Sequence, residues 1–346
     1  MRITWMVALL AATPLWPAAF TITDLGALGG STAVGFRINN SGVTVGWATT
    51  PANDNRAFQA GSGDVTPTGA SEAFVYGVNA SGVMAGTSFA GGQAHGTVWI
   101  GSSVIDLGAG TYGLAVSDAG AVAGGNGHAF ILVNGQMRDL GTLAGGSWSA
   151  AYAVNAEGSA AGYGDTGSGG FEAFMWSPGS GIVALGTLGG TNSYATSMNE
   201  AGVVTGHAAL ASGYEHAFEW SNGAMLDLGT LGGNSFAYDI NESGEVVGYS
   251  SLSNGASHAF LERNGLMVDL NSMLGTGTGW ELTAAYGIND AGQIVGTEIF
   301  QGQQRVFRLD PAQGTGAVSS AIPESRGAAL VGLGLGLLVL MRRWRS

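Results

Sequence analysis

Four histidines recur at one position of a repeated pattern, and imidazole is both a general acid–base and a metal ligand. They are His95, His128, His216 and His258. A ligand set must converge on one point, whereas equivalent residues of a repeat are held apart by the repeat itself. We therefore interpret them as structural, each a histidine at a strand end bonded to backbone. His207 lies outside the pattern, and we interpret it as a surface residue.

Two further motifs could suggest chemistry, namely an Asp-Leu-Gly sequence and a Gly-Thr-Leu-Gly-Gly type of loop. The aspartates are Asp24, Asp106, Asp139, Asp227 and Asp269, the last of which is followed by Leu-Asn rather than Leu-Gly, and the loops begin at Gly141, Gly186 and Gly229. The loops lack the Gly-Lys-Ser/Thr that holds a nucleotide phosphate, so we expect turns whose amides bond to the aspartates. Nothing places two carboxylates at one cleft, as a glycosidase needs, and calcium loops are absent. We predict no catalytic residue, no metal and no cofactor.

These motifs belong to a unit that is written seven times. An anchor residue is followed by Gly at +3 and again at +7, and successive anchors are 38 to 48 residues apart. The anchors are Asn39, Asn79, Ser117, Asn155, Asn199, Asn241 and Asn289. A period of this length indicates a propeller, a solenoid or an array.

Each unit reads as four short strands. Before the anchor, apolar residues at −1 alternate with mostly aromatic residues at −3 (Phe36, Tyr76, Tyr152, Tyr238, Tyr286), as in a half-buried strand. Asn-x-x-Gly then predicts a tight hairpin with a left-handed Gly. A second strand runs to the +7 Gly, a third carries His-Ala-Phe or its relic, and a fourth follows an Asn-Gly turn where that turn is clear.

Four strands in about 40 residues predict an all-β, seven-bladed β-propeller of four-stranded blades. Residues 21–26 read as a fourth-type strand and residues 305–309 as a third-type strand, so the two ends complete one blade and close the ring. An open β-array or solenoid, which would more naturally end in capping repeats, is the alternative.

Composition fits an exported, turn-rich domain. The chain has 62 Gly in 346 residues, 45% hydrophobic residues and no Cys, so disulfides and thiolate metal sites are excluded. Residues 20–310 carry six arginines against 23 acidic residues, a net charge of −17. Such a surface repels nucleic acid and anionic lipid at long range, so neutral glycans, cations or basic partners are favoured; acidity for solubility alone is the simpler interpretation.

Both termini read as targeting segments. Residues 1–19 have the layout of a signal peptide. After a linker at 311–321, the tail at 322–346 holds Pro323, Glu324 and Ser325, an apolar run at 327–341 expected to form a transmembrane helix, and a basic cluster of Arg342, Arg343 and Arg345.

This tail resembles the PEP-CTERM sorting signal of Gram-negative bacteria, although Ser325 replaces the second Pro of the motif. The resemblance implies an inner-membrane precursor facing the periplasm, processing by an exosortase, and release to the cell surface or extracellular matrix. The repeats at 20–310 look like the HAF family of extracellular repeats, which implies no particular activity.

In a meander, successive connections alternate between the two ends of the strands, so the anchor turns share one face and the variable loops the other. We predict ligand binding at the loop face, through its non-repeating aromatic residues, because aromatic rings stack on sugars and partners. They are Trp148, Tyr163, Tyr194, Tyr214, Phe236, Tyr249 and Trp280. Some of them could simply cover the blade ends.

Three functions remain open at this stage. The leading one is a non-enzymatic surface or matrix module that engages exopolysaccharide or other cell-envelope components, including cell-surface proteins. The second is a secreted glycan-active enzyme, which acids and a His at one mouth of the channel would favour. An ice-binding surface is disfavoured because Thr occupies no fixed repeat position.

Overall fold

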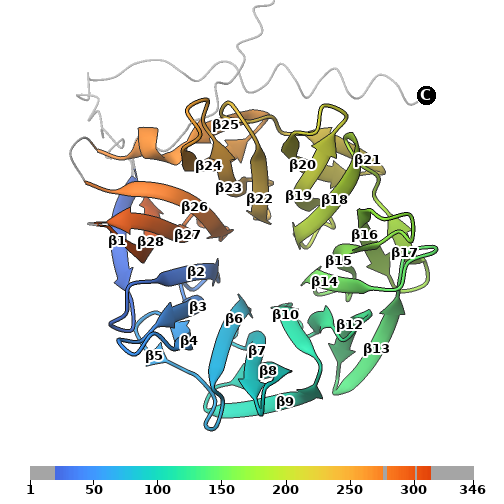
Figure 1. Cartoon of the computed structure of the whole chain (residues 1–346), viewed down its shortest axis with the longest axis horizontal. Coiled ribbons are helices and arrows are strands. Elements are labelled where there is room, and N and C mark those ends of the chain that lie inside the picture. The colour runs from blue at the N-terminus through green and yellow to red at the C-terminus, as the bar shows by residue number, and fades with distance from the viewer. Residues whose placement is uncertain (1–19, 276–278, 301, 313–346) are drawn as a thin grey trace, which may run out of the picture. The chain divides into compact units, whose positions relative to one another are not determined.

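The computed structural model describes residues 20–275, 279–300 and 302–312. Within these ranges the chain forms seven four-stranded antiparallel sheets around a central axis (Figure 1). The protein is therefore an all-β, seven-bladed propeller, as the repeat count predicts. The predicted signal peptide, the sorting motif, the transmembrane helix and the basic cluster lie outside the described residues. Among the residues that are described, no helix has the length and apolarity needed to cross a membrane.

The strands are given blade by blade from the innermost outward. Blade 1 contains β2 (Ala33–Ile38), β3 (Thr44–Thr49), β4 (Asn55–Gln59) and β5 (Gly63–Asp64). Blade 2 contains β6 (Glu72–Val78), β7 (Met84–Ala90), β8 (Gln93–Ile100) and β9 (Ser103–Ala109). Blade 3 contains β10 (Tyr112–Val116), β11 (Val122–Gly125), β12 (Ala129–Val133) and β13 (Gln136–Gly141). Blade 4 contains β14 (Ser149–Val154), β15 (Ala160–Asp165), β16 (Phe171–Ser177) and β17 (Gly181–Ala184).

The remaining blades follow the same order. Blade 5 contains β18 (Gly189–Met198), β19 (Val204–Leu210), β20 (Glu215–Ser221) and β21 (Ala224–Asp227). Blade 6 contains β22 (Ser235–Ile240), β23 (Val246–Ser251), β24 (Ser257–Arg263) and β25 (Leu266–Asp269), and a 3₁₀ turn, η1 (Leu270–Met273), follows it. Blade 7 contains β26 (Glu281–Ile288), β27 (Ile294–Phe300) and β28 (Gln303–Pro311), with β1 (Phe20–Gly26) as its outermost strand.

The ring is closed by the two ends of the folded region, as predicted. β1 pairs antiparallel with β28 from Phe20 opposite Pro311 to Gly26 opposite Val306. An ion pair between Arg305 and Asp24, 2.7 Å apart, joins the same two strands. This pairing covers the outer edge of β28 and completes the fourth strand of blade 7.

The repeated glycines have two different structural causes. The +3 Gly is left-handed in all seven anchor turns, with φ between 72° and 81°, as the hairpin prediction requires. The +7 Gly has no unusual φ; instead, a Cβ at Gly248 would overlap the carbonyl oxygen of Phe236 on the neighbouring strand. The second strand also continues past this Gly, as in β23, because Gly248 pairs with Ala237 of the neighbouring strand in the interior of the sheet rather than at the end of the strand.

The anchor asparagine serves the turn and also the contact between blades. Within its own turn, Asn39 accepts bonds at Oδ1 from the N–H groups of Ser41 and Val43. Its Nδ2 donates to the carbonyl of Asn79 in the next blade at 2.8 Å. The series ends with Asn289 Nδ2 donating to Asn39 O at 2.9 Å, across the ring closure. Ser117 has no amide to donate, so blade 3 lacks this link to blade 4.

The core lies between neighbouring blades. The Phe of His-Ala-Phe is fully buried at five positions: Phe130, Phe174, Phe218, Phe260 and Phe307. Each buried ring of this size contributes about 2 kcal/mol or more relative to exposure. The repeat therefore supplies a separate apolar cluster for each seam, and stability is distributed around the ring.

Candidate functional site

The central channel contains a cavity with a volume of about 680 Å³. The innermost strands direct their −3 residues into it: Phe36, Tyr76, Leu114, Tyr152, Thr196, Tyr238 and Tyr286. Arg37, Tyr112, Tyr163, Tyr194 and His207 complete the lining. We call this cavity the aromatic cup. It opens toward the loop face, because Tyr112, which lines it, begins β10 at that face.

Aromatic rings follow one another around the channel, and those that also line the cup are Phe36, Tyr76, Tyr163, Tyr194, His207, Tyr238 and Tyr286. From blade 4 to blade 6 the ring centroids are 4.7 to 5.6 Å apart in the series Trp148, Tyr163, Tyr194, His207, Phe236 and Tyr249. The series continues through Tyr238, Tyr286, Phe36, Tyr76, Phe74 and Trp47 to blades 7, 1 and 2 at spacings of 4.8 to 6.2 Å. We call these twelve rings the aromatic arc.

Burial shifts the pKa of several groups that line the cup. Burial raises the pKa of the Tyr76 phenol to about 12, and burial together with the neighbouring Tyr163 raises the pKa of Tyr152. Burial lowers the pKa of His207 to about 4, because the charged imidazolium would lose its hydration. Its Nδ1 is buried without a hydrogen-bond partner. The wall thus offers ring faces, phenolic hydroxyls and one neutral imidazole.

Arg37 forms the floor of the cup. Its Nη1 donates to Tyr286 O at 2.7 Å and to Tyr238 O at 3.3 Å, so the side chain from blade 1 reaches blades 6 and 7. Asp239 lies 3.7 Å from the same nitrogen and compensates the charge. Arg37 also lines the cavity beyond it, and it therefore separates the cup from the opposite mouth of the channel.

At one edge of the cup, a carboxylate holds the rim in place. Asp165 accepts bonds from the backbone N–H groups of Trp148 at 2.6 Å and Ser147 at 2.8 Å, and these bonds lower the pKa of its carboxyl. The segment that carries Trp148 is thereby fixed beside Tyr163. A ring positioned in advance loses little conformational entropy when a ligand stacks on it.

The structure brings together five of the seven aromatic residues predicted at the loop face. Trp148, Tyr163, Tyr194, Phe236 and Tyr249 all belong to the aromatic arc. The other two lie elsewhere. Tyr214 is 57% exposed on the loop between β19 and β20, and Trp280 packs against the core cluster of blade 7.

Sequence reasoning missed the −3 ring, Arg37 and His207. The −3 aromatic residues were explained as strand alternation, whereas their strand is the innermost one and faces the axis (Figure 1). The prediction that His207 is a surface residue is wrong, because blades 5 and 6 enclose it between Tyr194 and Phe236. The sequence did contain an indication of this, since His207 lies eight residues after its anchor, the same repeat position as Tyr163 and Tyr249.

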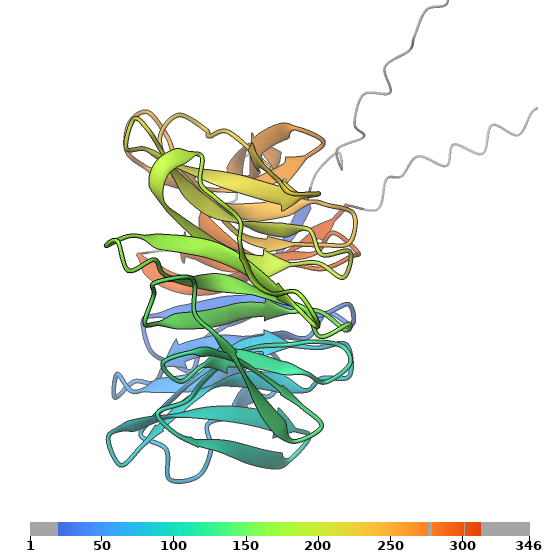
Figure 2. The same ribbon diagram turned by 90° about the vertical axis from the view of Figure 1, so that its right-hand side faces the viewer.

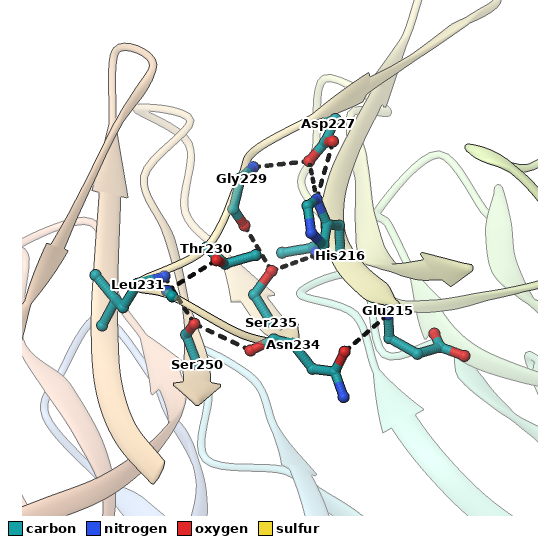
Figure 3. Close-up of polar contacts among 11 residues, drawn as sticks. Glu215, His216, Asp227, Gly229, Thr230, Leu231, Asn234, Ser235 and Ser250 are labelled. Atoms are coloured by element: carbon teal, nitrogen blue, oxygen red, sulfur yellow. Dashed lines mark hydrogen bonds and ion pairs between the residues drawn. The ribbon is translucent and has the colours of Figure 1, made fainter. Parts of the chain in front are cut away.

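The recurring histidines are structural, but their partner differs from the prediction. The Nδ1 of each bonds to the carboxylate of the recurring Asp in its own blade, rather than to backbone, at 2.7 to 3.0 Å; this Asp begins Asp-Leu-Gly in three blades and Asp-Leu-Asn at Asp269. Figure 3 shows His216 with Asp227, whose Oδ1 also accepts the N–H of Gly229 at 2.8 Å. The prediction that the aspartates bond to turn amides is therefore confirmed, and one carboxylate serves both strand and loop.

The Gly-Thr-Leu-Gly-Gly loop is held by serine. Ser235 Oγ donates to Gly229 O at 2.6 Å and accepts the N–H of Ala217 at 2.8 Å (Figure 3). The carbonyl and the N–H of Gly229 are therefore bonded within the protein, which agrees with the prediction that these loops are turns. Among the described residues, no group of His, Asp and Glu side chains is placed to hold a metal ion.

Acidic residues gather at the mouth opposite the cup. Asp118, Glu200, Glu242 and Asp290 each accept a backbone N–H from the preceding blade at 2.7 to 3.0 Å. Their carboxylates thus tie the anchor turns together. The acidic group lines the cavity beyond Arg37, whereas His207 lines the cup.

One of the known structures compared supports the fold, and the comparisons do not assign a function. The sequence matches no family model and no curated protein. A puromycin hydrolase mutant complexed with PGG is similar in fold, with a TM-score of 0.52 at 13% identity over 83% of this chain and 53% of that one. TolB from Acinetobacter baumannii gives 0.41 at 10% identity over 62% and 59%, and a gluconolactonase from Xanthomonas campestris gives 0.39 at 14% over 67% and 82%. This chain thus spans less than two thirds of the hydrolase and of TolB.

Proposed function

We propose that this protein is an exported surface or matrix module that binds a neutral glycan in the aromatic cup without converting it. The observation that carries the proposal is the aromatic arc around a cavity of about 680 Å³. Cavities of about 300 to 1,000 Å³ suit small ligands, so the cup has room for a short oligosaccharide.

The chemistry of the wall supports a sugar rather than a purely apolar ligand. The faces of sugar rings carry C–H groups that stack on aromatic rings, while their hydroxyls need hydrogen-bond partners. Tyr152 and Tyr163 share a bond between their hydroxyls at 2.9 Å, and either oxygen can also bond to a ligand.

Charge supports a neutral ligand. The only cation lining the cup is Arg37, whose charge Asp239 compensates, and the folded region is strongly acidic. Long-range repulsion would oppose polyanionic partners such as nucleic acid.

We also propose a cellular localisation for the protein. The tail favours export, an inner-membrane precursor processed by an exosortase, and final placement at the cell surface or in the exopolysaccharide matrix. Deleting residues 327–346 is expected to release the protein from membranes with its thermal unfolding unchanged. Retention of the shortened protein in the membrane fraction would contradict the proposed anchor.

Binding and turnover are tested together. The full chain in mild detergent is applied to an array of neutral and acidic glycans, and every glycan bound is then assayed for hydrolysis. Tyr238→Ala is expected to weaken binding about tenfold or more, whereas Tyr214→Ala, at an exposed tyrosine outside the cup, should leave it unchanged. Turnover of a bound glycan would replace the binding module with a glycan-active enzyme, and equal effects of both substitutions would remove the cup as the site.

A further inference from the structure

The wall of the aromatic cup is incomplete at blade 3. The aromatic arc runs through blades 4, 5, 6, 7, 1 and 2 and has no member from blade 3. At the two positions that supply rings elsewhere, blade 3 has Leu114 and Gly125, where blade 4 has Tyr152 and Tyr163. Apart from Tyr112, blade 3 therefore contributes no aromatic ring to the lining of the cup.

The rim is also cut down at this blade. The loop-face hairpin between the second and third strands is measured from the +7 Gly to the residue at the His position of His-Ala-Phe. In blade 3, His128 follows Gly124 by four residues, whereas the separation is nine or ten residues in the other six blades. β11 accordingly ends at Gly125 and β12 begins at Ala129. We call this gap, residues 125–127, the blade 3 notch.

Side-chain exposure is an independent sign of the missing cover. The side chain of His128 is 45% exposed, whereas its counterparts His95, His216 and His258 are each 19% exposed. All four make the same bond to aspartate, so the difference reflects the shortened hairpin rather than a different conformation.

One aromatic residue stands beside the notch. Tyr112 lines the cup and begins β10, and it is 46% exposed. Among the described residues, its ring makes none of the contacts that connect the arc. It therefore presents a free ring face where the cup meets the notch.

Resting on the function proposed above, we infer that the ligand is a neutral polysaccharide whose end segment lies in the cup and whose chain leaves across the blade 3 notch over Tyr112. The cup is too small for more than a short oligosaccharide, so a polymer must cross the rim. In six blades the aromatic rings and the longer loop-face hairpin obstruct that crossing. In blade 3 the hairpin is short and the arc has no ring. Charge excludes a polyanionic polymer for the reasons given for the cup.

The notch can be closed without touching the cup. Residues 251–256, which form the hairpin of blade 6, are inserted between Asn126 and Gly127. A control protein carries the same insertion between Asn134 and Gly135, in a turn on the opposite face. Thermal unfolding and far-UV circular dichroism verify that both proteins fold.

The probes are dextran, β-1,3-glucan and galactomannan, each paired with its own trisaccharide. The notch insertion is expected to weaken binding of the polymer about tenfold or more, about 1.4 kcal/mol, and to leave the trisaccharide unchanged. Tyr112→Ala should weaken polymer binding about threefold to tenfold, and by a larger factor than it weakens trisaccharide binding, because Tyr112 borders the notch as well as the cup. The control insertion should change neither.

The outcomes separate this inference from the function on which it rests. Polymer binding that survives the notch insertion, in a protein that binds both probes, would overturn the exit route and leave the cup as the binding site. Absence of binding to every polymer and every trisaccharide would overturn both proposals.

Discussion

Replacing Glu298 with Gln should make the stability of the ring much less dependent on pH. Glu298 lies on β27 of the closing blade, is fully buried, and has no hydrogen-bond partner on either carboxyl oxygen. Burial, with a smaller contribution from Asp24, raises its pKa from 4.5 to about 8, while Arg305 acts in the opposite direction. The folded protein therefore holds this carboxyl protonated at neutral pH.

The sign and size follow from linkage. Because the pKa is higher in the folded than in the unfolded state, the stability associated with Glu298 is fully present below pH 4.5 and is lost as pH rises toward 8. One pKa unit corresponds to about 1.4 kcal/mol, so the full loss is about 5 kcal/mol. Between about pH 5 and pH 8.5 the expected loss is about 4 kcal/mol. Gln has no proton to release, so E298Q lacks this loss.

The assay is urea unfolding, followed by circular dichroism, of the wild type and E298Q at several pH values in this interval. The difference in free energy of unfolding between the two proteins should change by about 4 kcal/mol in favour of E298Q as pH rises. Glu281→Gln, at an exposed residue of the same blade, is the matched control and should follow the wild type. Parallel profiles for wild type and E298Q would refute the reasoning, because they would mean that the buried carboxyl does not titrate in the interval.

The remaining predictions concern the repeat itself. Gly248→Val should lower the free energy of unfolding by about 3 kcal/mol or more, because the valine side chain would overlap the neighbouring strand. Gly244→Val, at a left-handed turn position, should lower it by about 1 to 2 kcal/mol. Equal melting temperatures for both variants and the wild type would contradict these causes. His216→Ala should lower stability by about 1 kcal/mol or less and leave glycan binding intact, so loss of binding by a folded variant would show that the histidine has a ligand. Ser117→Asn should supply the missing bond between blades 3 and 4 and raise stability by about 1 kcal/mol; calorimetry showing a decrease would mean that the seam cannot accept the amide.

The fold could be predicted because its determinants are local. Each blade is an antiparallel meander, so its pairings join segments that are near in sequence, and each turn has its own chemical requirement. The left-handed Gly42 and the Asn-Gly turn at Asn134 are recognisable without knowledge of any other blade. The closure could also be predicted, since β1 reads as a fourth-type strand and β28 as a third-type strand, and together they complete one blade.

The pairing of histidine with aspartate lay within reach of the sequence but was not found. His95 and Asp106, and His216 and Asp227, are each separated by 11 residues. A constant separation across a hairpin is expected when two side chains face each other on adjacent strands. Both positions were recognised as recurrent, but the constancy of their spacing was not used.

The sequence by itself determined the number of blades, the turns and the closing strands, because these depend on contacts within a repeat or between matching ends. Only the tertiary structure decided the site. Arg37 meets Asp239 across the channel, about 200 residues away, and His207 enters the aromatic arc through the contact of two blades. A period-two pattern says which residues of a strand share a face; it does not say which strand faces the axis, since that is settled only when seven blades pack into a ring.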